Sequence, residues 1–243
     1  SVKGKQVLVT GSTGGIGAQA AKMLAGSGAV VYISGRNGAK LNEVAQGIGI
    51  PAERVFVADM ADAASVQAIA RGILAQIPAL DILVNAAGIG IIKPMDTLSL
   101  EEFQQTLQSN LVGPFNLLKA FLPTMKEQKK GLIINIPGVL GKVPMAGAAA
   151  YSASKYGRVG MMQSVREELK RTEFRITNLF LGGVDYPFWD NIDLRVQRDK
   201  MIVAEEAAKA IWFLCQQPRS GVVREMLLQP LDYTSRQCAR LRV

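Results

Sequence analysis

The sequence predicts an α/β fold with a doubly wound parallel sheet of about seven strands and helices on both faces. Apolar runs rich in β-forming residues alternate with helical patterns along the 243 residues. The apolar runs are continuous rather than alternating, as expected of strands that are covered on both faces. The connections between the elements are short, and such an alternation favours parallel strands.

Seven apolar runs predict the strands, at residues 5–11, 29–35, 54–59, 81–88, 131–136, 175–181 and 225–230. Six segments with helical spacing lie between them: Gly15–Ser27, Ala39–Ile48, Ala64–Ile77, Leu100–Lys130, Ala149–Arg171 and Ala204–Gln216. No linker or internal repeat interrupts this order. We therefore expect residues 1–243 to form a single domain.

The longest stretch without a clear regular pattern is 182–202. A loop of this length in a compact domain is usually functional, so we predict a substrate loop here. Tyr186, Phe188 and Trp189 would give it an apolar face. A surface excursion that packs on itself is the alternative.

Composition excludes several classes of chemistry. The chain has no histidine, which excludes Ser-His-Asp hydrolysis and most zinc sites, and we expect no metal. Cys215 and Cys238 are too few for a disulfide framework and indicate a cytoplasmic location. No apolar run is long enough to span a bilayer, and no signal peptide is visible.

The net charge of +8 raises nucleic acid or an anionic membrane surface as possible partners. The basic residues are scattered, however, apart from residues 126–130 and the tail 236–242. No basic stripe interleaved with aromatic residues is present, so we expect a solvated basic surface and no nucleic-acid partner.

The segment "VLVTGSTGGIGAQAAKML" places Gly11, Gly15 and Gly17 between the first predicted strand and the first predicted helix. Glycines are needed where the chain turns tightly and where its backbone approaches a pyrophosphate closely. The start of the helix then offers free N–H groups and a favourable dipole. In this context the pattern predicts a Rossmann-type dinucleotide site rather than an ordinary tight turn.

The end of the second strand indicates which dinucleotide is bound. An acid about twenty residues after the glycines usually holds the ribose 2′-hydroxyl of NAD. Here no acid lies between Ala29 and Asn42, and Arg36 stands at the turn. An arginine suits a 2′-phosphate, so we expect NADP, with NAD as a possible substitute. Arg36 as a plain surface residue is the alternative.

With the glycine loop, "NAAG" (85–88) and "YSASK" (151–155) in this order, the chain resembles the short-chain dehydrogenase/reductase family over nearly its whole length. The resemblance implies that Thr10–Gly17 cradles the pyrophosphate, that Asp59 contacts the adenine and that Asn110 supports an active-site water and a lysine. Tyr151 and Lys155 match the catalytic pair. Together with Arg36, the cofactor residues expected are Gly11, Ser12, Thr13, Gly15, Ile16, Gly17, Asp59, Met60, Asn85, Ala86, Gly88, Tyr151, Lys155, Gly183 and Val184.

The Tyr151–Lys155 pair also has a physical rationale of its own. Residues four apart share one helix face, so the lysine ammonium can lie near the tyrosine ring. A phenol with a pKa near ~10 is a poor acid or base at neutral pH, and a nearby cation lowers that pKa. The catalytic residues expected are therefore Asn110, Tyr151 and Lys155, with Tyr151 as the general acid/base.

Three positions depart from the family pattern, and one of them is Leu181, which stands after the sixth strand where the family often has a proline. The family places a serine thirteen residues before the tyrosine, and this chain has Gly138 there, after Pro137. It also has Tyr186 where the family often has a threonine that holds the nicotinamide carboxamide. Losing one of two donors to a developing oxyanion costs about 10²–10³ in rate, so we expect slow turnover.

The leading hypothesis is an NADP(H)-dependent oxidoreductase acting on a carbonyl compound or an alcohol. The alternative is a weak or inactive relative that binds dinucleotide as a sensor or structural partner. Residues 138–147 suggest a mainly apolar pocket, with Lys142 as an anion contact. The apolar positions of 100–130 and 149–171 exceed what one sheet face can cover, which predicts a homotetramer or homodimer.

Overall fold

The computed structural model describes residues 1–192, 194–218 and 220–231. Cys238 and the basic tail 236–242, noted in the sequence, lie outside the described residues. A parallel seven-stranded sheet has the order β3-β2-β1-β4-β5-β6-β9. Its strands are β1 (Gln6–Thr10), β2 (Val30–Gly35), β3 (Val55–Val57), β4 (Ile82–Asn85), β5 (Lys130–Asn135), β6 (Glu173–Leu181) and β9 (Glu225–Leu228). All seven predicted strands are present, and the predicted doubly wound fold is confirmed.

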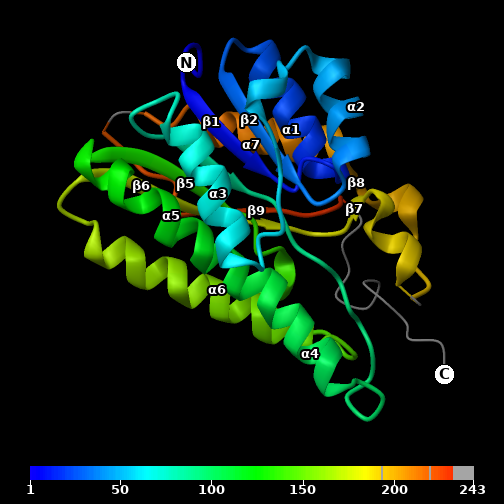
Figure 1. Ribbon diagram of the computed structural model, residues 1–243. Helices are drawn as coiled ribbons and strands as arrows, with labels where there is room; N and C mark the ends of the chain where they lie inside the picture. Colours follow the sequence, from blue (N-terminus) through cyan, green and yellow to red (C-terminus); the bar gives the residue numbers. More distant parts are fainter. Residues whose placement is uncertain (193, 219, 232–243) are drawn as a thin grey trace.

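The α-helices of the described chain are α1 (Gly15–Gly26), α2 (Gly38–Ile48), α3 (Ala63–Leu74), α4 (Leu100–Leu107), α5 (Gly113–Glu127), α6 (Ala149–Glu168) and α7 (Ala204–Leu214). Helices α1, α2 and α7 cover one face of the sheet, and α3, α5 and α6 cover the other (Figure 1). Two apolar cores result, one on each face. This is why the strands read as continuous apolar runs.

The predicted helix Leu100–Lys130 is interrupted in the structure. Helix α4 ends at Leu107, a π-helical turn covers Gln108–Val112, and α5 begins at Gly113. The extra residue in a π turn shifts the helical register, and such turns are frequent at functional sites. Asn110 lies in this turn and is fully buried.

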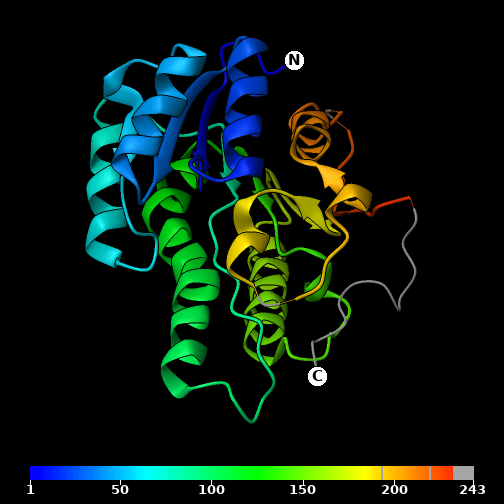
Figure 2. The same ribbon diagram turned by 90° about the vertical axis from the view of Figure 1, so that its right-hand side faces the viewer.

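The stretch 182–202 also has more structure than its sequence suggests. Strands β7 (Val184–Asp185) and β8 (Ile202–Val203) pair in parallel, and short 3₁₀ helices cover 187–191 and 198–200. Arg198 bonds to Asp185 and Asp190 and so joins the two ends of the segment. In Figure 2 this yellow segment lies between α1 and α6. It therefore borders both the glycine loop and the helix that carries Tyr151.

Candidate active site

The glycine loop forms a tight turn at the carboxyl end of β1. Gly11 has a φ of +70°, and a Cβ there would stand 2.8 Å from the backbone nitrogen of Ala87. A Cβ on Gly17 would stand 2.4 Å from the carbonyl oxygen of Gly11. Only glycine fits at either position, because the β1 turn, the end of β4 and the start of α1 meet there. The start of α1 has no side-chain cap and no acid in its first turn, so its N–H groups are available to an anion.

A cavity of about 270 Å³ opens beside this turn. We call it the glycine-loop cavity, and the predicted residues that line it are Gly11, Thr13, Ile16, Gly17, Arg36, Asp59, Met60, Ala86 and Gly88. Arg36 follows β2, and Asp59 follows β3, as expected of residues at the carboxyl ends of parallel strands.

Lys40 lines the same cavity and was not predicted as a site residue. The Asn37 side chain caps α2 by accepting a bond from the Lys40 backbone nitrogen at 3.0 Å. This cap starts the helix directly after Arg36, so both basic side chains are exposed at one wall of the cavity. Neither makes an ion pair within the described residues, so both are available to a dianionic phosphate.

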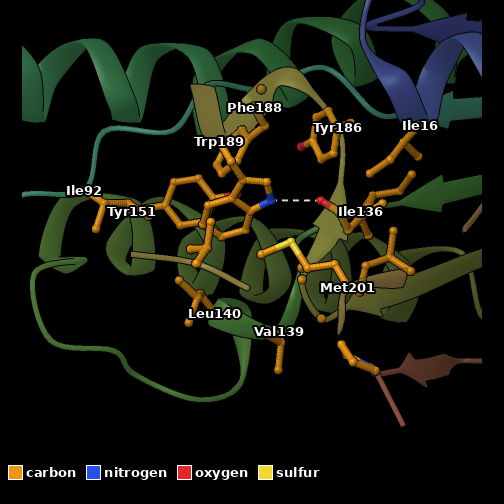
Figure 3. Close-up of a pocket in the computed structure, with 18 of the residues that line it drawn as sticks. Ile16, Ile92, Ile136, Val139, Leu140, Tyr151, Tyr186, Phe188, Trp189 and Met201 are labelled. Atoms are coloured by element: carbon orange, nitrogen blue, oxygen red, sulfur yellow. Dashed lines mark hydrogen bonds between the residues drawn. The ribbon is translucent and has the colours of Figure 1, made fainter. Parts of the chain in front are cut away.

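A second cavity, of about 160 Å³, lies over α6. We call it the tyrosine cavity (Figure 3), and the predicted site residues that line it are Ile16, Ala86, Gly88, Tyr151, Lys155, Gly183 and Val184. Its remaining wall is mainly apolar and includes Ile92, Val139, Leu140, Met145 and Met201. The predicted apolar contribution of 138–147 is therefore present. Lys142 instead bonds to Glu225 and does not line the cavity.

Tyr151 and Lys155 lie together in this wall, with the lysine Nζ 4.9 Å from the centroid of the tyrosine ring. Burial raises the pKa of Tyr151 to about 12, and the charge of Arg158 opposes this increase. Burial lowers the pKa of Lys155 well below its usual value, and Arg158 adds to the decrease. The decrease expected from a nearby cation is therefore wrong for this structure, because burial outweighs it, and the tyrosine is protonated at neutral pH and can donate a proton.

Asn110 does not line the cavity but lies behind Gly88, which does. Its Nδ2 donates to the Ile89 carbonyl at 3.0 Å and to the Ser154 hydroxyl at 3.2 Å, and its Oδ1 accepts from the Ile89 nitrogen at 2.9 Å. A Cβ on Gly88 would stand 2.9 Å from Asn110 Oδ1 and 3.5 Å from Lys155 Nζ. Asn110 therefore fixes the loop after β4 against α6, and Gly88 leaves room for the lysine.

Three of the predicted cofactor residues lie outside both linings. Ser12 is buried and donates to the Val9 carbonyl at 2.8 Å, and Asn85 is buried at the end of β4. Gly15 packs against the loop 182–202, because a Cβ there would stand 2.5 Å from the Cβ of Tyr186. Ser12, Gly15 and Asn85 thus lie behind the residues that line the two cavities.

Tyr186 and Phe188 line both cavities and so lie where the two meet. The Phe188 ring is centred 6.0 Å from that of Tyr151 and 5.5 Å from that of Tyr186. Trp189 contacts Phe188 edge to face and donates to the Val184 carbonyl at 2.8 Å (Figure 3). The apolar face predicted for this loop therefore points into the site.

Gly138 lines the tyrosine cavity with a φ of +72°. A Cβ there would meet only the Leu181 carbonyl oxygen, at 3.6 Å, which is an ordinary contact. The position has space for a side chain but a backbone conformation that disfavours one.

A glycine turn after the first strand of a doubly wound sheet, beside a cavity at the carboxyl ends of the strands, defines a Rossmann-type nucleotide-binding protein. Among the described residues no cluster of His, Cys, Asp or Glu is placed to hold a metal ion. The helices described here include none that is long and apolar enough to cross a membrane.

Comparison with known proteins gives the family. The short chain dehydrogenase model matches residues 5–196. The chain is 32% identical to an uncharacterised oxidoreductase of Staphylococcus epidermidis, over 95% of this chain and 99% of that protein. It is 38% identical to D-threitol dehydrogenase of Mycolicibacterium smegmatis, over 77% of this chain and 74% of that enzyme. The protein therefore belongs to the short-chain dehydrogenase family of oxidoreductases.

Solved structures of short-chain oxidoreductases have the same fold. A metagenomic short-chain oxidoreductase in complex with NADP superposes with a TM-score of 0.80 at 33% identity, covering 95% of this chain and 99% of that one. An alcohol dehydrogenase of Thermococcus sibiricus complexed with 5-hydroxy-NADP has a TM-score of 0.84 at 26% identity, covering 96% and 99%.

Proposed function

We propose that this protein is an NADP(H)-dependent oxidoreductase that reduces a small-molecule carbonyl compound or oxidises the corresponding alcohol. The observation that supports it best is the position of the Tyr151–Lys155 pair, in an apolar cavity that adjoins the glycine-loop cavity. The structural neighbours solved with NADP or its 5-hydroxy derivative support the choice of cofactor.

The residues present fit such a cofactor. The start of α1 and the glycine turn would hold the diphosphate, and Arg36 with Lys40 would hold the 2′-phosphate. Asp59 and Met60 would border the adenine, and Gly88, Lys155, Gly183 and Val184 the nicotinamide end. When bound, the cofactor supplies or accepts a hydride.

In the reducing direction Tyr151 donates its proton to the carbonyl oxygen of the substrate. The proton is present at neutral pH because burial raises the pKa of Tyr151 to about 12. The developing phenolate is then stabilised by the ammonium form of Lys155, whose Nζ is 4.9 Å from the ring centroid, although burial lowers the pKa of that lysine. Asn110 contributes by holding the β4 loop and the Ser154 turn of α6 in place.

Gly138 leaves the substrate oxygen without the hydroxyl that the family pattern supplies at this position. The negative charge that develops on the substrate oxygen is then stabilised by Tyr151 and by any backbone N–H group near Gly138. We propose that turnover is slow for this reason.

The test is a titration of the purified protein with NADPH and NADH followed by fluorescence, and then a panel of carbonyl compounds followed by oxidation of the reduced cofactor. We expect NADPH to bind more tightly than NADH and at least one apolar ketone or aldehyde to be reduced. Tighter binding of NADH would contradict the assignment of Arg36 and Lys40.

The second candidate is a relative that binds the dinucleotide without efficient catalysis. Gly138 and the aromatic side chains between the two cavities favour it. Tight NADPH binding without turnover of any carbonyl compound would select this function.

A homotetramer or homodimer and a cytoplasmic location stay predictions. Phe115 on α5 is 48% exposed and Tyr156 on α6 is 44% exposed, which supports a contact between copies on this side of the molecule.

A further inference from the structure

Arg158 is the largest fully buried side chain among the described residues, and its relative exposure is 0%. It lies on α6 and faces the sheet. Its Nη2 donates to the Asn85 carbonyl at 2.6 Å, and its Nε donates to the Asn135 side chain. Asn135 in turn donates to the Asn178 side chain at 2.8 Å. The guanidinium therefore joins α6 to the carboxyl ends of β4 and β5, where Asn85 and Asn135 stand.

This arginine has no carboxylate partner within the described residues. Its Nη1 also lacks a hydrogen-bond partner in that part of the chain. Burying a charge in this way is unfavourable unless the charge is paired. Burial lowers the pKa of Arg158 to about 9, so the guanidinium is still cationic at neutral pH. An uncompensated cation at this depth calls for a physical reason.

The location of Arg158 on α6 suggests a reason for this buried charge. Tyr151, Lys155 and Arg158 stand at positions i, i+4 and i+7 of α6, a spacing that places all three on one helix face. The charge of Arg158 acts on both Tyr151 and Lys155 in the folded chain. The charge of Arg158 is not neutralised locally, so it acts on an ionisable group of the same helix face that can become an anion. That group is the Tyr151 phenol.

The other ionisable groups near Tyr151 do not provide the same field. Lys155 Nζ lies 4.9 Å from the centroid of the Tyr151 ring, but burial lowers the pKa of this lysine. Its positive charge is therefore lost at lower pH than that of an exposed lysine. Tyr186 from the loop 182–202 is a second phenol whose own pKa is raised by burial and by Tyr151, so it supplies no positive charge. Lys200 lines the same cavity but is exposed, so water screens its charge.

We propose that Arg158 is a positioning residue for the Tyr151–Lys155 pair: it anchors α6 to the ends of β4 and β5, and its charge favours the ionised form of Tyr151. A role of Arg158 in catalysis rests on the proposed function, whereas its effect on the ionisation of Tyr151 does not. In a chain with Gly138 in place of a serine, this buried cation would offset part of the lost stabilisation of negative charge at the site.

The experiment measures the ionisation of residue 151 directly. A fluorinated tyrosine in place of Tyr151 ionises at lower pH than tyrosine, and its fluorine NMR signal reports its charge without cofactor or substrate. We expect Arg158→Met to raise the apparent pKa of this residue by about one pH unit or more, because a cation that stabilised the phenolate is gone. Arg158→Gln is also neutral and can still donate to the Asn85 carbonyl, so it provides a second measurement if the methionine variant fails to fold.

The matched control is Arg166→Met. Arg166 is also an arginine of α6 that bonds to strand carbonyls, through Nη2 to Ile176 at 3.0 Å and to Arg224 at 3.2 Å. It lies two turns beyond Arg158, so we expect no shift in the ionisation of residue 151. A loss of stability in both variants with a shift in Arg158→Met or Arg158→Gln alone would support the proposal.

An unchanged or lowered pKa of residue 151 in the neutral Arg158 variants would overturn it. Where a carbonyl substrate is found, the pH–rate profile of Arg158→Met should move in the same direction as the NMR titration. A protein that turns over no substrate would contradict the proposed function and leave the NMR result valid.

Discussion

The glycine-loop cavity and the tyrosine cavity adjoin, yet they are built in different ways. The first is lined by short motifs at the ends of β1 to β4, and its character comes from glycines and from the charges of Arg36, Lys40 and Asp59. The second gathers side chains from α6, the β5–α6 connection and the loop 182–202, and its wall is mainly apolar. The first cavity has the features of a binding site for a charged ligand, and the second those of a site for chemistry on an apolar one.

Replacing Tyr151 should separate these two roles most sharply. Tyr151→Phe removes the only proton donor that we assign to the reaction, and positioned general acids contribute about 10²–10⁴ in rate. We expect carbonyl reduction to fall by about 10³-fold or more, while NADPH affinity stays within about twofold, since the hydroxyl adds little to binding. Steady-state rates and a fluorescence titration of the same samples measure both.

An unchanged rate in Tyr151→Phe would remove Tyr151 from the mechanism. A large loss of NADPH binding would show that the two cavities do not act separately.

The reverse separation is expected from the other cavity. Arg36→Ala together with Lys40→Ala removes both cations that we assign to the 2′-phosphate. Hydrogen bonds to charged groups contribute about 1.5–3 kcal/mol, so NADPH affinity should fall by about 10–100-fold. NADH affinity should change little, which makes the ratio of the two dissociation constants the decisive quantity.

Arg71→Ala is the matched control for this double variant, because Arg71 is an exposed arginine on α3 outside both cavities. Equal losses for NADPH and NADH in the double variant would indicate a general electrostatic effect instead of a phosphate contact.

The contrast between the cavities also explains what the sequence could predict. The strands, the glycine turn and the position of Arg36 follow from local patterns, because continuous apolar runs and glycines carry their meaning over a few residues. Lys40 was missed because a lysine one turn into a helix is ordinary in sequence, and only the Asn37 cap brings it beside Arg36.

The tyrosine cavity was harder to predict because its features depend on packing between distant segments. Phe188 contacts Tyr151, which is far from it in the chain. Likewise, Gly15 leaves room for Tyr186, and Gly90 leaves room for Phe188. In the sequence, Arg158 is one of several arginines in a predicted helix, and only the fold shows that it is buried. No local sequence pattern predicts the π turn at Asn110.

Gly138→Ser tests whether the tyrosine cavity lacks only one donor. The structure leaves room for the side chain, since the nearest atom to a Cβ is 3.6 Å away. The φ of +72° opposes it, and strain of this kind costs about 1–3 kcal/mol. One recovered oxyanion donor contributes about 2.7–4 kcal/mol, so we expect kcat/KM to rise by about 10-fold and the midpoint of thermal unfolding to fall.

Gly138→Ala is the control for this variant, because it carries the same strain without the hydroxyl. It should lose stability and gain no activity. A serine variant that binds NADPH but is no faster than wild type on any carbonyl compound would favour the non-catalytic function.

The smallest expected effect concerns the border between the two cavities, where Tyr186 lies against Gly15 and lines both. A dinucleotide that occupies both cavities must pass this ring, so the ring has to move or be accommodated before the complex forms. Tyr186→Thr keeps a hydroxyl and removes the ring, and it should tighten NADPH binding by about 3–10-fold, because a state that needs no rearrangement binds with its full intrinsic affinity. Tyr156→Thr is the control on the 44% exposed outer face of α6, and there we expect no change. Weaker binding in Tyr186→Thr would show that the ring is part of the cofactor wall, in which case the two cavities form one continuous binding surface and their separation holds only for the chemistry.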